Sequence, residues 1–356
     1  MDKYKILISK GSYEKAISFL EELKTGHSTG KYLQEKLNHI DLFQITPVEF
    51  IELIIGTKKP QIFAESAVFG NGSDWEQIEL SILGDISITA SVTVFDNGRH
   101  IGPEVHETPF SATLLFTPGA LLRNDRNLIP ADWKELTRDG EIHSEAYCQL
   151  YERRLLPSLL YANEQVNTRD SMVLITIPGL GCGQFAGKFR GQLGVEFKNA
   201  LKTILENHGS SLSNIKVVYF DPYRECENER HEINGISFLV RPLTKGNENK
   251  PQLCKPTDYQ EEGNEFADCE LFSFVAWDHV SWPGNDFYAG SRVTDDGVKA
   301  AATDVMMVMT GIEGKYDAST NKYNPPAEYD NWGEVIRKNK VQIKVKDNLI
   351  ISSLPG

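Results

Sequence analysis

Three aspartates, Asp278, Asp286 and Asp296, fall within one passage that also carries tryptophan, tyrosine, asparagine and glycine. The passage follows an apolar run, residues 271–276, that is typical of a buried strand. It precedes an Ala/Met-rich stretch, about 295–310, that is typical of a helix. Loops at the carboxyl ends of strands hold the ligands of open α/β sheets. Grouped carboxylates in such a loop suit recognition of a sugar or a cation.

Each carboxylate also has a structural explanation. Asp295 and Asp296 fall in the first turn of a helix capped by Thr294, where the helix dipole stabilises negative charge without a ligand. Asp286 fits an ordinary turn residue within Pro-Gly-Asn-Asp. Asp278 is the hardest to explain in this way, because it ends an apolar strand where an ionised side chain must find donors. The three together indicate function more strongly than any one of them.

A second candidate site is the glycine-rich run that directly follows an expected strand at 172–177. Its members are Gly179, Gly181, Cys182, Gly183, Gln184, Phe185, Ala186 and Gly187. Glycines let the backbone approach a ligand closely and direct successive N–H groups at a diphosphate. Two other interpretations stay open, a connection without a ligand and a dinucleotide fingerprint, whose loose form 181–186 matches. The fingerprint fits less well because no helix begins at once and Asp221 lies farther downstream than its usual acid.

Bulk composition limits the class of protein. With 356 residues and 40% hydrophobic content, the chain can build one large domain or two ordinary ones. Its net charge is −13 and no Lys/Arg-dense stripe appears, so a nucleic-acid partner is not expected. An anionic ligand would have to be held locally by backbone N–H groups.

Cysteine and histidine usage points away from a metal or redox centre. The five cysteines are widely scattered, which fits a reducing compartment, and the eight histidines form no ligand-spaced cluster. We therefore expect no metal and no cofactor. The N-terminus lacks the apolar core of a signal peptide, and no apolar run approaches the length of a membrane span. A soluble, cytosolic monomer with no membrane association is expected.

The elements that must position the two loops are expected from periodicity and capping signals. Residues 1–60 are predicted to be a helical N-terminal segment, with helices at 12–24 and from Thr46-Pro47 to Gly56. An α/β domain is expected over 61–356. Its first part should be a β extension with strands at 79–83, 86–95 and 110–116.

The remainder of the α/β domain alternates between strand and helix patterns, which implies a parallel sheet. Residues 226–270 are predicted to be a polar insertion with one short strand. The expected helices are 144–165, 193–208, 295–310 and 332–338, and the expected strands are 172–177, 215–220, 236–240, 271–276 and 341–345.

Over residues 110–310 the chain resembles a macrodomain, the ADP-ribose-binding α/β fold. The resemblance rests on the strand that runs into Gly-x-Gly-x-Gly-x-Phe and on the second strand, loop and helix that end in Gly-Val-x-x-Ala-Ala. The spacing of the three aspartates, with the Trp, Asn and Gly residues around them, is similar to that of the MavL-type macrodomain effectors of Legionella. Those proteins act on ADP-ribosylated arginine, notably on ubiquitin, and carry three important aspartates.

This chain also departs from the common macrodomain pattern. The usual Asn-Ala-Ala-Asn ribose loop is absent, as is the glycine-triplet and paired-glutamate signature of the poly(ADP-ribose) glycohydrolases. The candidate ribose loop follows the phosphate loop, so a circularly permuted order is implied. The resemblance therefore implies a three-layer α/β/α fold with a mixed sheet, and leaves the aspartates as the catalytic candidates.

The resemblance also implies roles for individual residues. The run from Gly179 to Ala186 would hold the diphosphate, with Phe185 on the ribose, and Tyr223 would stack on adenine. Asp286 and Asp296 would position the distal ribose and activate water, while Asp278 would contact the guanidinium or an adjacent hydroxyl. The remaining ligand-binding candidates beside these aspartates are Trp277, Asn285 and Phe287.

Three functions remain as alternatives. The first is a hydrolase that removes ADP-ribose from modified arginine on a protein, with ubiquitin as the named candidate and secretion into a host cell as the implied setting. The second is a non-catalytic reader of ADP-ribosylated proteins. The third is a nicotinamide-dependent oxidoreductase.

Overall fold

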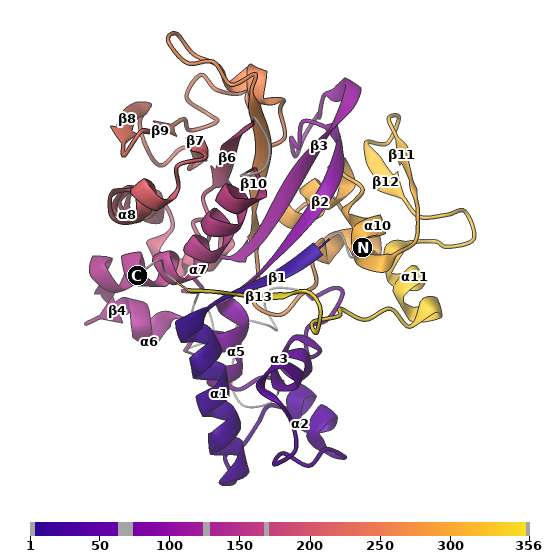
Figure 1. The fold of residues 1–356 in the computed structure, drawn as a ribbon. Coiled ribbons are helices and arrows are strands. Elements are labelled where there is room, and N and C mark those ends of the chain that lie inside the picture. The colour runs from indigo at the N-terminus through magenta and orange to yellow at the C-terminus, as the bar shows by residue number, and fades with distance from the viewer. Residues whose placement is uncertain (1–3, 63–73, 124–128, 167–170, 354–356) are drawn as a thin grey trace.

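A nine-stranded mixed sheet runs through the molecule (Figure 1). The computed structural model describes residues 4–62, 74–123, 129–166 and 171–353. The strand order is β13-β1-β2-β3-β10-β6-β7-β9-β8, and the central strands β3, β10, β6 and β7 pair in parallel. The strands are β1 (Tyr4–Ser9), β2 (Ile86–Asp96), β3 (Val105–Pro118), β6 (Met172–Pro178), β7 (Ile215–Asp221), β8 (Glu229–Ile233), β9 (Ile236–Val240), β10 (Cys269–Trp277) and β13 (Leu349–Ser352).

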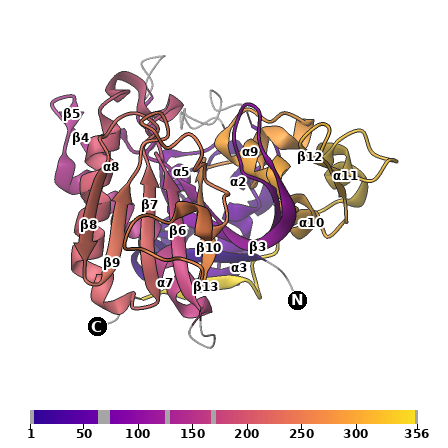
Figure 2. The same ribbon diagram turned by 90° about the horizontal axis from the view of Figure 1, so that it is seen from above.

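Helices cover both faces of this sheet, which gives the three layers that the macrodomain resemblance implies (Figures 1 and 2). The helices are α1 (Lys10–Lys24), α2 (Lys31–Leu37), α3 (Pro47–Ile55), α5 (Gln77–Gly84), α6 (Trp133–Leu136), α7 (Ser144–Gln165), α8 (Leu193–His208), α9 (Asp295–Ala302), α10 (Val305–Thr310) and α11 (Trp332–Asn339). Short 3-10 helices are η1 (Gln184–Phe189), η2 (Gly209–Ser211), η3 (Pro256–Tyr259) and η4 (Asn285–Ala289). Two small hairpins pair β4 (Thr137–Arg138) with β5 (Glu141–Ile142) and β11 (Lys315–Asp317) with β12 (Lys322–Asn324).

The sheet divides the apolar core into two clusters because successive strand side chains point to opposite faces. On β7, Val218 and Phe220 pack with α7 and α8, whereas Val217 and Tyr219 face the other cluster. That second cluster contains side chains of α9 and α10 and of the long segment 241–268. The mixed α/β fold with helices on two faces is therefore confirmed.

The N-terminal segment is mostly helical, and it also contributes a strand. Thr46 and Glu49 form the expected capping box at the start of α3. Tyr4–Ser9, however, form β1, which lies inside the sheet between β13 and β2. A short apolar run of six residues does not reveal by itself whether it is buried in a sheet. The division at residue 60 stays a prediction.

Three local expectations were wrong. Residues 79–83 are not a strand, because Gln77–Gly84 form α5; the run is too short for its period to decide between helix and strand. The expected helix 295–310 is two helices, α9 and α10, although Gly311 caps the second as predicted. The last strand is β13 rather than 341–345, and it pairs with β1 at the far end of the chain.

Candidate functional site

Four loops leave one edge of the sheet, at the carboxyl ends of β3, β10, β6 and β7. The register pairs Pro118 with Trp277 across β3 and β10, and Pro178 with Asp221 across β6 and β7. Since β10 and β6 are neighbours, the glycine loop (residues 179–187) and the aspartate loop (residues 278–296) follow adjacent parallel strands. The loop after β3, residues 119–123, emerges at the same edge.

The glycine loop touches the loop after β3 backbone to backbone. Gly181 has a φ of +74°, and a Cβ there would lie 2.7 Å from the amide nitrogen of Ala120. A Cβ on Gly119 would lie 2.3 Å from the nitrogen of Gly181. Both contacts exclude any side chain, so these two glycines are required by the approach of the loops.

The exposed part of the glycine loop presents backbone amides. Gly183 and Gln184 are exposed, and Phe185 is half-buried at the start of η1. Among the described residues, the amides of these three residues donate to no backbone acceptor. Consecutive N–H groups of this kind form a concavity that suits an anion. The carbonyl of Phe185 accepts a hydrogen bond from Leu122 N at 2.8 Å, which fixes the start of η1 to the loop after β3.

Cys182 and Ala186 face inward. Both side chains are buried, and the Cys182 thiol lies 3.6 Å from the carbonyl oxygen of Leu180. Burial, assisted by the negative charge of Glu225, raises the pKa of this thiol well above its ordinary value. Cys182 is therefore an inert packing residue of the loop, and any ligand contact there would come from the backbone.

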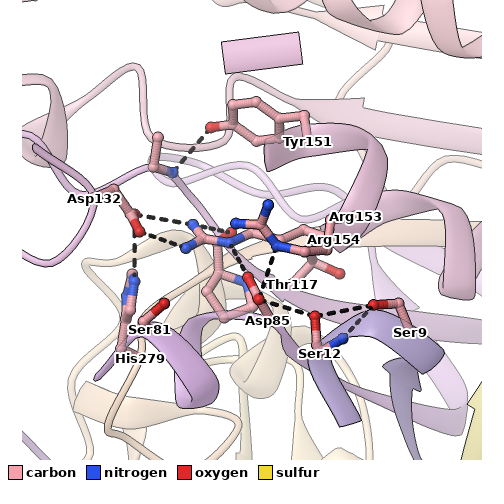
Figure 3. A network of polar contacts seen from close by, with 12 residues as sticks. Ser9, Ser12, Ser81, Asp85, Thr117, Asp132, Tyr151, Arg153, Arg154 and His279 are labelled. Carbon is pink, nitrogen blue, oxygen red and sulfur yellow. Dashed lines mark hydrogen bonds and ion pairs between the residues drawn. The ribbon is translucent and has the colours of Figure 1, made fainter. Parts of the chain in front are cut away.

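Tyr151 of α7 joins two of the loops from below. Its hydroxyl donates to the carbonyl of Leu180 at 2.5 Å. It also accepts from the amide of Ala120 at 3.0 Å, the contact drawn from Tyr151 in Figure 3. The ring is fully buried, so the two bonds are shielded from water. The spacing of the glycine loop is thus set by a helix that precedes it in the chain.

Asp278 is saturated by its own loop. Its carboxylate accepts from Val280 N, Ser281 N, the Ser281 hydroxyl and Asn285 Nδ2, at 2.8, 2.6, 2.5 and 3.1 Å respectively. Four donors satisfy a buried carboxylate, which explains how it can lie 6% exposed at the end of a strand. Asp278 therefore shapes the aspartate loop.

The N-terminal segment reaches into the site beside Asp278. Lys58 is buried, donates to the carbonyl of His279 at 2.7 Å, and places its ammonium 3.9 Å from the centre of the Trp277 ring. Burial lowers the pKa of Lys58 to about 7, against the opposing effect of Asp278. The backbone of Lys59 forms an isolated parallel β-bridge with that of Ser281. The aspartate loop is thus held by a segment more than two hundred residues away in sequence.

Asp286 lies half-buried against the start of α9. Its Oδ2 accepts from Val293 N at 2.9 Å and Thr294 N at 3.3 Å, and its Oδ1 contacts the Thr294 hydroxyl. A Cβ on Gly297 would overlap Oδ1 at 1.9 Å. A glycine at this position is what allows the carboxylate to lie directly against the helix backbone.

Asp296 is the anomalous member of the three. It is 2% exposed, its Oδ1 lies 2.6 Å from the Thr294 hydroxyl, and its Oδ2 has no partner among the described residues. Burial, with the negative charges of Asp278 and Asp286, raises the pKa of Asp296 well above its ordinary value. Thr294 does cap α9, by accepting from Gly297 N, so the capping explanation holds for Thr294 and does not satisfy Asp296.

Neighbouring Asp295 shows the contrast. Its Oδ2 accepts from Ala276 N at 2.7 Å and from Lys299 Nζ at 3.0 Å. It therefore fastens α9 to β10, and we assign it no chemistry.

The aromatic candidates of the aspartate loop are mostly buried in the core. Trp277 and Phe287 are each 2% exposed, and Asn285 donates to Asp278 and accepts from Ile62 N at 2.8 Å. The Trp277 ring nitrogen has no partner among the described residues. These residues support the loop from behind.

Tyr288, like Asp296 Oδ2, has a buried polar atom without a hydrogen-bond partner among the described residues. Its buried hydroxyl has none among the described residues, and burial, together with the charge of Asp296, raises its pKa. A tyrosine beside a turn carries no signal in the sequence, so Tyr288 was missed.

Tyr223 and Asp221 lie at the end of β7. Tyr223 has a φ of +61°, is 55% exposed, and is free to present its ring to a ligand. Asp221, the acid weighed for a dinucleotide fingerprint, accepts from Tyr223 N, Leu243 N and Gln252 Nε2. Its oxygens are thus engaged in holding the turn.

A second acidic cluster, drawn in Figure 3, adjoins the aspartate loop at His279. Arg154 of α7 donates to Asp132 at 2.7 Å, lies 3.3 Å from Asp85, and donates to the Gly119 carbonyl at 3.1 Å. Asp132 also accepts from Leu121 N at 2.8 Å, and His279 Nε2 lies 3.4 Å from it. Burial would raise the pKa of Asp132, but Arg154 and His279 outweigh it and hold that pKa well below its ordinary value. This network anchors the loop after β3 to the start of the aspartate loop.

Three features of the wider chain bear on function. The described residues contain no group of three or more His, Cys, Asp or Glu arranged to hold a metal ion. In the same part of the chain, no helix combines the length and apolarity that a bilayer crossing needs. All five cysteines are free.

A protein-family model matches most of the chain. The family model described as macrodomain effector MavL matches residues 4–329, which is most of the chain and includes all four loops. No curated protein matches the chain.

Proposed function

The chain belongs to the MavL family of macrodomain effectors, and we propose that it binds ADP-ribose and hydrolyses its bond to arginine on a modified protein. The observation that carries this proposal is the pairing of two loops on adjacent strands. One offers unbonded amides, and the other gathers three carboxylates with no cation paired to Asp286 or Asp296 among the described residues. ADP-ribosyl-arginine has the complementary ends, a diphosphate and a guanidinium.

The diphosphate would lie on the amides of Gly183, Gln184 and Phe185. A chain of net charge −13 repels anions at long range, so it must bind one through local dipoles. Phe185, half-buried at the loop, would pack on the proximal ribose, and the exposed ring of Tyr223 would stack on adenine.

The arginine end would meet the aspartate loop through Asp286, the most exposed of the three carboxylates. A guanidinium pairs well with carboxylates because its planar donors match their oxygens. Asp278 would act by holding the shape of the loop. The buried Asp296 would act on Asp286 through the Thr294 hydroxyl, which contacts both carboxyl groups.

Hydrolysis at this site would pass through a cationic, oxocarbenium-like sugar that the carboxylates stabilise. A water oxygen bonds to the anomeric carbon while the carbon–nitrogen bond breaks. The electron pair of the broken carbon–nitrogen bond goes to the guanidine nitrogen. Asp286 takes the proton of the water, and the released guanidine then takes up a proton to become guanidinium again. No metal or cofactor enters these steps.

The decisive test compares linkages. Incubation with arginine-linked and glutamate-linked ADP-ribosylated proteins, followed by measurement of free ADP-ribose, should show release from arginine alone. Release from glutamate only would contradict the assignment. Ubiquitin is the proposed carrier, and a pull-down that shows no preference for ADP-ribosylated over unmodified ubiquitin would remove that part.

A non-catalytic reader is the second candidate. It is favoured by one observation, that Asp278 and Asp296 are buried and only Asp286 is partly open. A reader would show ADP-ribose binding by calorimetry without turnover, whereas a hydrolase shows both.

A further inference from the structure

The Thr294 hydroxyl has three close polar neighbours. It accepts from Gly297 N at 3.1 Å, and it lies within hydrogen-bond range of Asp286 Oδ1 and of Asp296 Oδ1, the latter at 2.6 Å. A hydroxyl offers one proton and two lone pairs. The amide occupies one lone pair and the proton reaches one carboxyl group. The other carboxyl group is best satisfied at this distance if it is itself protonated and donates to the second lone pair.

The contacts decide which of the two carries that proton. Asp286 Oδ2 accepts from two backbone amides, Val293 N and Thr294 N, and amide donors favour an ionised acceptor. Asp296 has no such donors among the described residues, and its Oδ2 is buried without a partner. A buried, unpaired anion is costly, so Asp296 is the acid.

The charged groups around Asp296 agree with this assignment. Asp278, Asp286 and Asp295 are acidic residues that disfavour a further negative charge on Asp296, and Tyr288 also interacts with it. Lys299 of α9 interacts electrostatically with Asp296. Its ammonium group, however, already donates to Asp295 and to the carbonyl of Phe274. Lys58 interacts electrostatically with Asp278, and its ammonium group donates to the carbonyl of His279.

We propose that Thr294 is a positioning residue that holds Asp296 as a neutral acid, so that Asp286 is the only anion of the pair. The catalytic consequence rests on the proposed function, because one anion flanked by a neutral acid can take a proton from water. The location of the proton does not depend on any activity.

Carbon-13 NMR of the ligand-free protein, labelled at the aspartate carboxyl carbons, tests the location directly. Asp296→Asn and Asp286→Asn identify the two signals. At pH 7 the Asp296 signal should be that of a protonated acid and the Asp286 signal that of a carboxylate. A carboxylate signal from Asp296 at pH 7 would overturn the proposal.

Kinetics with arginine-linked substrate provide the second readout. Asp296→Asn keeps a donor to Thr294 and should lower kcat by about tenfold or less, whereas Asp286→Asn should lower it by about 10²–10⁴. The wild type should lose activity at alkaline pH as Asp296 ionises, and Asp296→Asn should lack this alkaline limb. Equal losses in the two Asn variants, or an alkaline limb that survives in Asp296→Asn, would contradict the proposal.

Thr294 has its own matched pair of variants. Thr294→Ser keeps the hydroxyl and should restore most of the activity that Thr294→Val loses, about tenfold or more. Failure of Thr294→Ser to do so would count against the positioning role. If the wild type releases no ADP-ribose at all, the proposed function fails, and the NMR titration still decides where the proton lies.

Discussion

Two acidic clusters meet where His279, next to Asp278, lies 3.4 Å from Asp132, and they have opposite electrostatics. In the lower one, Asp85 and Asp132 are buried against Arg153, Arg154 and Lys15, and the pKa of each aspartate is lowered despite its burial. In the upper one, Asp296 is equally buried without a paired cation among the described residues, and its pKa is raised. The lower cluster is complete as it stands. The upper cluster is complete only with a ligand cation or a proton, which is the mark of a site.

The largest expected effect comes from removing the cation of the lower cluster. Arg154→Met leaves Asp132 and Asp85 short of their buried partner, and should lower the free energy of unfolding by about 3–5 kcal/mol. Urea unfolding measures the loss. The matched control is Arg99→Met, which breaks the exposed pair with Glu104 and should change stability by about 1 kcal/mol or less. Similar losses in both variants would show that the lower cluster is not the anchor.

The next effect concerns the loop that the lower cluster anchors. Gly181→Ala introduces a Cβ 2.7 Å from Ala120 N and should cost about 1–3 kcal/mol of stability, with weaker ADP-ribose binding by calorimetry. Gly235→Ala is the control, since Gly235 also has a positive φ, +81°, but no atom lies within 4 Å of the added Cβ. Gly235→Ala should leave ADP-ribose binding unchanged. Unaltered ADP-ribose binding in Gly181→Ala would show that the glycine loop is not part of the binding site.

The two clusters should also respond oppositely to pH. Because the folded-state pKa of Asp296 is raised, folded protein keeps a proton that the unfolded chain has lost, so stability falls as pH rises above about 4. Asp296→Asn should therefore gain on the wild type by about 1.4 kcal/mol per pH unit until Asp296 ionises in the folded state. The lowered pKa of Asp132 has the opposite sign, since its contribution is present at neutral pH and lost on acidification.

Unfolding measured from pH 2 to 8 checks both signs. Asp132→Asn should be less stable than the wild type at pH 7, and the deficit should shrink only below about pH 4, where the unfolded chain takes up the proton. Parallel curves for the wild type and Asp296→Asn would show that the upper cluster is neutralised in some other way.

The smallest effect is expected at the rim. Tyr223 is exposed, so Tyr223→Ala should leave the unfolding free energy within about 0.5 kcal/mol. Loss of stacking on adenine should weaken ADP-ribose binding by about 0.5–1.5 kcal/mol. Unchanged affinity would place the adenine elsewhere.

The sequence predicts what local signals encode. The capping box at Thr46, the strand at Met172–Pro178 and the amphipathic helix Leu193–His208 all follow from nearby residues and match the structure. The run at 79–83 has no decisive period, and its helical form depends on tertiary contacts such as Glu79 accepting from Gly30 N.

The same limit applies to the site. Both loops could be located from composition and spacing, but the support given by Tyr151 and Lys58 joins residues far apart in the chain. Gly119 could have been found, because it is a glycine three residues after an expected strand. The sequence could not show which aspartates are satisfied by hydrogen bonds. Asp278 has four donors, and Asp296 has an oxygen without a partner among the described residues, only because of how the loop folds.

The most direct test of the proposed function is the release of ADP-ribose from arginine-modified ubiquitin by the wild type and by Asp286→Asn. The control Glu328→Gln removes one charge from an exposed position far along the chain and should act like the wild type. We predict release by the wild type and a loss of about 10²–10⁴ in kcat for Asp286→Asn, with ADP-ribose still bound. Full activity of Asp286→Asn, or no release by the wild type, would contradict the assignment of this protein as an arginine-specific hydrolase.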